Sequence, residues 1–332
     1  MEFFRQLDKK YEDTFIWPTP QIVKSYQNIK VKLTSGDIED LFTSKYPNCF
    51  PVLFSSARSG ITAITKSLDL KRQDYVWIPP YASTCVLAAL SHQCTPCPDE
   101  KSKNIVASLV FHQWGFPFQV GMGNEIIEDS VDSFCLDESC LFPNDGRFEI
   151  LSLPKIFGTI TGGIILCQQK SDYKKLIAIR DSYNKIKWRQ FFLRQFASKS
   201  KVLGGYWTHS ESINGCLPWL ALGDIYDKVT HWDQLAQDRI DKIRYLQSKK
   251  IRSELNMNPS RLPTCWPISY SEVADNLLKK HGISHGARHI PTTQKSATSE
   301  TIKVLPIPLH TQYSIERLQK LGSHLTNAKS FN

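Results

Sequence analysis

The 332-residue sequence contains no apolar run long enough to cross a membrane. Its most apolar stretch, near residues 162–167, is far shorter than the roughly 18–20 residues of a transmembrane helix. The first fifteen residues, MEFFRQLDKKYEDTF, are charged throughout and lack the apolar core of a secretory signal. We therefore expect a soluble, cytoplasmic protein.

Metal-binding and dinucleotide-binding patterns are also scarce. Of nine cysteines, only Cys94 and Cys97 form a CxxC pair, and no second pair or His pair follows at zinc spacing. We therefore expect no metal site and reduced thiols. The single GxG, from Gly121 to Gly123, precedes an expected strand instead of following one, which argues against a Rossmann fingerprint.

The composition is that of an ordinary globular protein. It is 41% hydrophobic and 22% charged, which excludes disorder, collagen and coiled coil. The length allows one large α/β domain and a smaller one. The net charge of +9 favours acidic partners without choosing among phosphate-bearing substrates, nucleic acid and membrane surfaces.

Strand and helix patterns alternate in the first half of the chain. Apolar runs at 104–112, 124–129, 148–154 and 162–167 indicate strands, and helical spacing appears after Ser56 and again from Ser83. This alternation predicts an α/β fold with a mainly parallel central sheet, which binds ligands at the carboxyl ends of its strands.

The second half is more helical. Residues 232–255 form an amphipathic pattern whose apolar face includes Ile240, Ile243, Leu246 and Ile251. The tail then predicts a helix, a strand over 301–309 and a final helix. We expect an N-terminal arm and a large α/β domain over residues 1–200, and a helical connection followed by a small C-terminal α/β domain over 201–332.

Three segments contain candidate functional residues. In SSARSG, from Ser55 to Gly60, a turn of small residues opens into a helix, whose first N–H groups could bind an anion; a simple helix cap is the alternative. The strand NEIIED ends in Asp129, which could hold a pyridine nitrogen protonated or could cap the next turn. Lys155 lies among apolar and small residues, where a desolvated amine with a lowered pKa suits Schiff-base chemistry, although a lysine can also reach out to solvent.

The order of these segments resembles the DegT/DnrJ/EryC1/StrS family of pyridoxal 5′-phosphate (PLP) dependent aminotransferases. The resemblance rests on SSARSGITAITKSLDL with YVWIPPYASTCVLAAL, IIEDSVDSF, LSLPKIFGTITGG and VLPIPLHTQYSIERLQKLGSHL. It implies the aspartate aminotransferase-like fold (fold type I) and PLP as the cofactor. Lys155 would form the Schiff base and Asp129 would pair with the ring nitrogen.

The same resemblance implies the other cofactor contacts. The backbone around Ala57, Arg58 and Ser59 would hold the phosphate, with Ser152 nearby, and His112 would lie beside the cofactor. Three positions depart from the family pattern. Ser83 replaces the aromatic residue that stacks on the ring, a role that Tyr81 or Trp114 could take. Asp132 replaces a neutral glutamine or histidine at a cofactor-contacting position, and Ala57 replaces a glycine.

The implied function is amino transfer from an amino acid, most often glutamate, to a nucleotide-linked keto-sugar or another ketone or aldehyde. A homodimer that shares its active sites is implied as well, with a role such as polysaccharide biosynthesis. The departures favour one alternative, a catalytically degenerate binding or regulatory protein. A second alternative, PLP-dependent dehydration, is disfavoured because Lys155 is retained.

A basic segment remains outside these motifs. Residues 170–201 contain ten Lys or Arg against two acids, with aromatic residues between them. Such a segment could contact a membrane surface or a polyanion, including a diphosphate-bearing sugar. We prefer a solvated helix face between the domains and expect no nucleic-acid partner.

Overall fold

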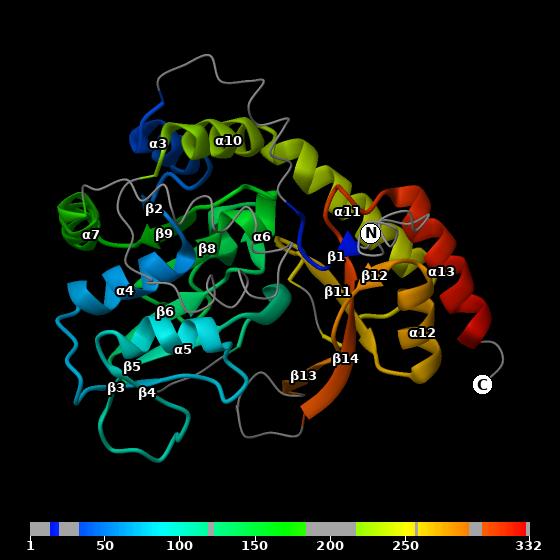
Figure 1. Ribbon diagram of the computed structural model, residues 1–332, viewed down its shortest axis with the longest axis horizontal. Coiled ribbons are helices and arrows are strands. Elements are labelled where there is room, and N and C mark those ends of the chain that lie inside the picture. Colours follow the sequence, from blue (N-terminus) through cyan, green and yellow to red (C-terminus); the bar gives the residue numbers. More distant parts are fainter. Residues whose placement is uncertain are drawn as a thin grey trace, which may run out of the picture.

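The computed structural model describes residues 14–19, 33–118, 123–183, 217–255, 258–291 and 301–329. A large α/β part and a smaller α/β part lie side by side (Figure 1). Among the described residues, no helix has both the length and the apolar character needed to span a bilayer.

A seven-stranded sheet forms the centre of the large part, in the order β2-β9-β8-β6-β5-β3-β4. Neighbouring strands are parallel except around β9, which runs antiparallel to both β2 and β8. The predicted mainly parallel sheet is confirmed. The strands are β2 (Phe50–Phe54), β3 (Tyr75–Trp77), β4 (Thr95–Cys97), β5 (Ile105–Phe111), β6 (Glu125–Asp129), β8 (Phe148–Ser152) and β9 (Gly163–Cys167).

Alternate residues of the sheet enter two separate cores. Leu53, Leu151 and Ile164 face one side, where α3 (Ser35–Lys45) and α10 (Trp219–Thr230) pack. Val52, Ile150 and Ile165 face the other, where α4 (Ala57–Ser67), α5 (Thr84–Ser91) and α7 (Lys170–Ser182) pack. Because both faces are covered, β8 and β9 are buried along their whole length, and β9 is apolar throughout.

The small part is a three-stranded antiparallel sheet with helices beside it. Its strand order is β11-β14-β13, formed by β11 (Cys265–Ser269), β14 (Thr301–Pro308) and β13 (Arg288–Pro291). Helices α12 (Glu272–Lys280) and α13 (Ile315–Lys329) complete it. The expected strand over 301–309 and the two flanking helices are confirmed.

The long helix α11 (Trp232–Ser248) is shorter than the pattern over 232–255 predicts. The chain leaves the helix at Lys250, whose φ is 56°. Ile251 is still buried, but it packs into the core from the following loop and not from the helix face. The apolar spacing could not reveal this, because a buried residue just after a helix continues its hydrophobic pattern.

The expected division between residues 200 and 201 lies outside the described residues and stays a prediction. Beyond it, α10 contacts the large part. The backbone N–H of Ile160 donates to the Asp224 carboxylate at 2.6 Å, and Lys228 donates to the carbonyl oxygen of Gly158 at 2.6 Å. These bonds fix α10 next to the loop between β8 and β9.

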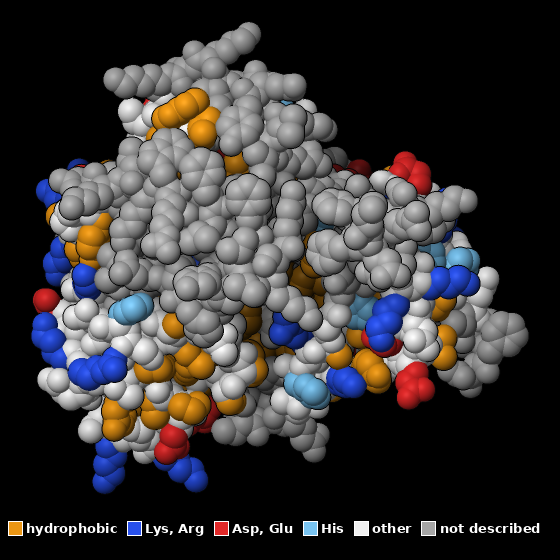
Figure 2. Space-filling model, in the orientation of Figure 1, with side chains coloured by type: hydrophobic (Ala, Val, Ile, Leu, Met, Phe, Trp, Pro, Cys, Tyr) orange, Lys and Arg blue, Asp and Glu red, His pale blue; other side chains and the backbone are white. Residues whose placement is uncertain are grey.

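The start of the basic segment is the helix α7, and the rest of it lies outside the described residues from 184 onward. Lys and Arg side chains are visible along the edge of the molecule where α7 lies (Figure 2). One of them is used internally, because Arg180 forms an ion pair with Glu39 of α3. The expected membrane or polyanion contact remains a prediction.

Four further short strands form two pairs that join distant parts of the chain. Strand β7 (Ser133–Cys135) pairs with β10 (Arg261–Pro263), and β1 (Thr14–Phe15) pairs in parallel with β12 (Ile283–Ser284). Cys135, the last residue of β7, forms a disulfide with Cys140, so the expectation of reduced thiols fails for this pair. The other described cysteines are free thiols.

Candidate active site

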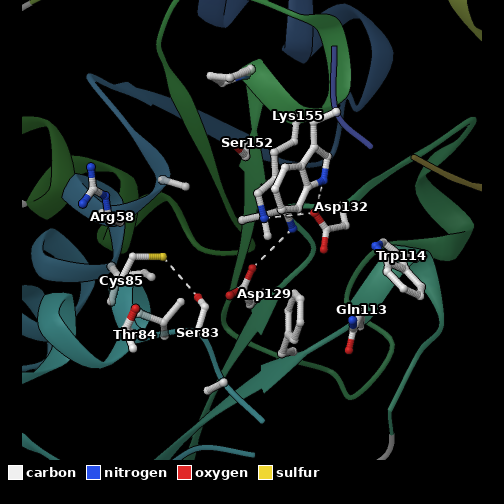
Figure 3. Close-up of a pocket in the computed structure, with 18 of the residues that line it drawn as sticks. Arg58, Ser83, Thr84, Cys85, Gln113, Trp114, Asp129, Asp132, Ser152 and Lys155 are labelled. Atoms are coloured by element: carbon white, nitrogen blue, oxygen red, sulfur yellow. Dashed lines mark hydrogen bonds and ion pairs between the residues drawn. The ribbon is translucent and has the colours of Figure 1, made fainter. Parts of the chain in front are cut away.

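A cavity of about 850 Å³ lies at the carboxyl ends of the sheet strands, where the small part approaches through β13. The large part supplies residues from α4, α5, β5, β6 and β8, while Arg288 and His289 come from β13. This is the edge at which a parallel sheet is expected to bind ligands. Figure 3 shows that Asp129, Asp132, Ser152 and Lys155 converge in this cavity.

Asp129 is the last residue of β6 and is 1% exposed. Its carboxylate accepts a hydrogen bond from the backbone N–H of Val131 at 3.3 Å. Burial raises the pKa of Asp129 to about 7, although nearby Lys155 opposes this shift. A carboxylate held in this way can pair with a cationic group that enters the cavity.

Lys155 lies on α6 (Leu153–Phe157), a single helical turn that follows β8 directly. Pro154 starts the turn and Gly158 ends it with a φ of 70°, so the turn cannot extend and Lys155 stays at the sheet edge. Burial alone would lower the pKa of Lys155, but Asp132 and Asp129 more than offset this and raise it. The expected lowered pKa is therefore wrong for the protein without a cofactor, because two carboxylates face one amine.

Asp132 makes the closest contact with Lys155. Its Oδ1 lies 3.0 Å from Lys155 Nζ and also accepts a hydrogen bond from the indole N–H of Trp17 at 3.1 Å. The Lys155 ammonium lies 4.6 Å from the centre of the Trp17 ring, within the range of a cation–π contact. Asp132, Lys155 and Trp17 thus form a compact group that lines the cavity. Figure 3 shows Asp132 next to Lys155.

The turn before α4 lines the opposite wall through Ser56, Ala57 and Arg58. Ser56 caps the helix by accepting a hydrogen bond from the N–H of Ser59 at 3.1 Å. The positive end of α4 therefore faces the cavity, which favours an anion. Burial lowers the pKa of Arg58.

Gly162 and Gly163 bring the start of β9 against this turn. The backbone of Ser56 forms a bridge with Gly162, whose φ is 110°. A Cβ on Gly163 would lie 2.3 Å from the backbone nitrogen of Ala57. The Gly-Gly pair is therefore required for the close approach of two backbones, and it holds the α4 turn close to the end of β8.

Two candidate cofactor contacts do not line the cavity. His112 is buried on the other side of its strand, where Nε2 lies 2.6 Å from Glu128 and Nδ1 accepts the N–H of Phe118 at 3.0 Å. Ser59 is also turned inward, and its hydroxyl contacts the hydroxyls of Ser55 and Ser56. Neither side chain reaches the cavity, because the first hydrogen-bonds to Glu128 and the second contributes to a helix cap.

Aromatic side chains enclose the cavity at several points. Tyr81 and Trp114, the two candidates for stacking on the ring, both line it, and so does Ser83. Phe111 lines it as well, and its ring centre lies 6.5 Å from that of Tyr81. Phe111 pairs in register with Asp129, at the end of the neighbouring strand. This position in the sequence could have identified Phe111 as a residue of the cavity.

Other lining residues carry no local signal. Trp17 lies 115 positions from Asp132, and Arg288 and His289 come from a short strand of the small part. No motif places these residues, because they reach the cavity only through tertiary packing.

Comparisons with known proteins agree with this geometry. Residues 38–328 match a family described as "Putative PLP-dependent aminotransferase". Among solved structures, the fold is similar to the PLP form of the "Putative sugar aminotransferase Spr1654 from Streptococcus pneumoniae" (14% identity, TM-score 0.63, 94% of this chain and 97% of that one). It is also similar to the aminotransferase TlmJ from Streptoalloteichus hindustanus (14%, 0.63, 96% and 99%) and to DesI with its TDP-sugar product (12%, 0.67, 96% and 93%). No curated protein matches the sequence.

The fold and the cavity define a PLP-dependent transferase of fold type I, as the order of motifs predicted. The chain belongs to the family of PLP-dependent aminotransferases whose model spans residues 38–328. The family match confirms the predicted cofactor, PLP, and the predicted enzyme class, a PLP-dependent aminotransferase.

Proposed function

We propose that Lys155 carries PLP through a Schiff base and that the enzyme moves an amino group from an amino acid to a sugar-linked ketone or aldehyde. One observation carries this proposal: an amine, a buried carboxylate and a helix N-terminus meet in one cavity. These are the partners that the aldehyde, the ring nitrogen and the phosphate of PLP require.

Each part of the cavity would have a separate role in binding the cofactor or in proton transfer. Asp129 would hold the ring nitrogen protonated, and the turn at Ser56 and Ala57 would bind the phosphate. When bound, PLP supplies an electron-withdrawing ring that stabilises negative charge at the Cα of the amino acid. When not bonded to the cofactor, Lys155 Nζ would accept the Cα proton and deliver it to the C4′ carbon of the cofactor, which requires an amine free to move within the cavity.

The substrate class rests on weaker support. Spr1654 is described as a sugar aminotransferase and DesI is described with a TDP-sugar product, so we propose glutamate as the donor and a nucleotide-linked keto-sugar as the acceptor. Arg58, Arg288 and His289 at the cavity wall suit an anionic substrate. By the same resemblance, we propose a homodimer.

Borohydride reduction with peptide mass mapping tests the assignment of Lys155. We expect a pyridoxyl mass on Lys155 in the PLP-loaded protein and its loss in Lys155→Arg, while Lys45→Arg, a surface lysine, keeps it. A pyridoxyl group on another lysine, or none at all, would overturn the assignment.

Spectroscopy tests the substrates separately. We expect glutamate to bleach the visible absorbance of the loaded enzyme, and a TDP-linked 4-keto-hexose to restore it. If pyruvate restored the visible absorbance and the TDP-linked 4-keto-hexose did not, the sugar acceptor would be excluded. The role of Lys155 would be unaffected.

A further inference from the structure

Lys155 contacts Asp132. By the resemblance described above, the position of Asp132 carries a neutral glutamine or histidine in the family. Asp132 is 2% exposed, and the only cation within ion-pair distance of it in the described part of the chain is Lys155, at 3.0 Å. A buried carboxylate without a cation would be costly. The Lys155 ammonium therefore supplies the positive charge that stabilises the buried Asp132 carboxylate.

Trp17 completes the contact from the N-terminal side. Its indole N–H donates to the same oxygen, Oδ1, that Lys155 approaches, and its ring lies 4.6 Å from the ammonium. Both contacts favour the charged amine, since the first orients an anion beside it and the second is a cation–π contact.

The segment that carries Trp17 is anchored to the small part. The carbonyl oxygen of Phe15 lies 2.8 Å from His310 Nε2, and the Cys265 thiol lies 3.3 Å from the carbonyl oxygen of Ile16. On the other side of Trp17, the N–H of Thr19 donates to Gln312 at 2.8 Å. Trp17 is thus fixed by partners on both sides along the chain.

We propose that Asp132 and Trp17 form a holding site for the Lys155 ammonium, which the lysine occupies before the cofactor binds. This inference rests on the proposed role of Lys155. Asp132 and Trp17 are positioning residues in it: they keep the free amine charged and fixed beside Asp129, at a defined place in the cavity.

The electrostatic surroundings of Lys155 support this role. The titratable groups that act on the amine are Asp132, Asp129 and the thiol of Cys85, and the amine in turn acts on Cys265. Burial lowers the pKa of Lys155, and the carboxylates of Asp132 and Asp129 raise it above the ordinary lysine value. Of these, Asp132 makes the strongest contribution and forms the direct contact.

Competitive acetylation of the full chain without PLP tests the holding site. Lysines are labelled with a trace of acetic anhydride from about pH 7 to about pH 11, and the rate at each lysine is read by mass spectrometry, with Lys45 as internal reference. The midpoint of each curve gives the lysine pKa, and the plateau at high pH gives its accessibility.

We expect Asp132→Asn to lower the midpoint of Lys155 by about one pH unit, which makes the amine about tenfold more reactive near pH 8. Trp17→Leu should lower it by less, and Trp17→Phe, which keeps a ring, by less again. Asp241→Asn, which removes an exposed carboxylate paired with Arg244, should leave Lys155 unchanged.

Equal midpoints for Lys155 in the wild type and in Asp132→Asn would overturn the holding site. If Trp17→Leu changed the high-pH plateau of Lys155 but not its midpoint, Trp17 would only cover the lysine. Trp17 would then not be part of the holding site. Because labelling needs no cofactor, these outcomes are independent of whether borohydride places PLP on Lys155.

Discussion

Glu128 and Asp129 are adjacent in β6, yet their side chains enter opposite environments. Glu128 lies 2.6 Å from His112 Nε2 inside the protein, whereas Asp129 lines the cavity. The alternation of side chains along a strand separates them. One carboxylate thus contributes to folding and the next is available for the chemistry.

Replacing Asp129 should affect activity more than structure. For Asp129→Asn we expect kcat to fall roughly 10- to 100-fold, because a charged hydrogen bond to the ring nitrogen contributes about 1.5–3 kcal/mol. Steady-state kinetics with glutamate measures this. Glu125→Asn, on the same strand but outside the cavity, is the control. Equal kcat for Asp129→Asn and the wild type would contradict the role of Asp129.

The same substitution should stabilise the cofactor-free protein at high pH. The folded-state pKa of Asp129 is raised to about 7 from 3.8, so the folded protein is penalised as pH rises from about 4 to about 7. We expect the stability gain of Asp129→Asn over the wild type to grow by on the order of 2 kcal/mol between pH 5 and pH 8. Urea unfolding at the two pH values measures it. A gain that shrinks as pH rises would refute the raised pKa.

His112 should matter for stability and not for PLP binding. His112→Ala removes one hydrogen bond from the buried Glu128 carboxylate, which keeps those from Asn144 and Gly146, and we expect a loss of about 1–3 kcal/mol. Urea unfolding should show this loss, while the affinity for PLP measured well below the unfolding midpoint stays close to that of the wild type. His92→Ala, at an exposed position, is the matched control. Loss of PLP affinity without loss of stability would instead support a cofactor contact.

Gly163→Ala should disturb the phosphate turn. Its Cβ would lie 2.3 Å from the backbone nitrogen of Ala57, and a backbone cannot move aside as a flexible side chain can. We expect overpacking to cost about 1–3 kcal/mol and PLP to bind more weakly. Gly286→Ala is the control, because no atom lies within 4 Å of the added methyl group. Equal PLP affinity in both variants would show that the turn does not depend on this approach.

The fold, and the position of Asp129 and Lys155 at one edge of the sheet, could be predicted because their signals are local. Asp129 ends an apolar strand and Lys155 follows the next one in the sheet, so the order of segments along the chain places both at one edge. Trp17 could not be predicted in this way. Its contact with Asp132 spans 115 positions and depends on how the N-terminal segment packs against the small part. His112 was misplaced because a short motif does not say which way a side chain at a strand end will turn.

The antiparallel strand β9 also has a kinetic consequence. In the described sheet, β2 pairs only with β9, although more than a hundred residues separate them along the chain. The turn at Ser56 follows β2 directly, so it is held in place only after β9 has been synthesised and inserted between β2 and β8. Pairing over such a separation is slow, because a long loop must close first. During synthesis and refolding, the capacity to bind the coenzyme phosphate should therefore appear late, after most of the large sheet has formed.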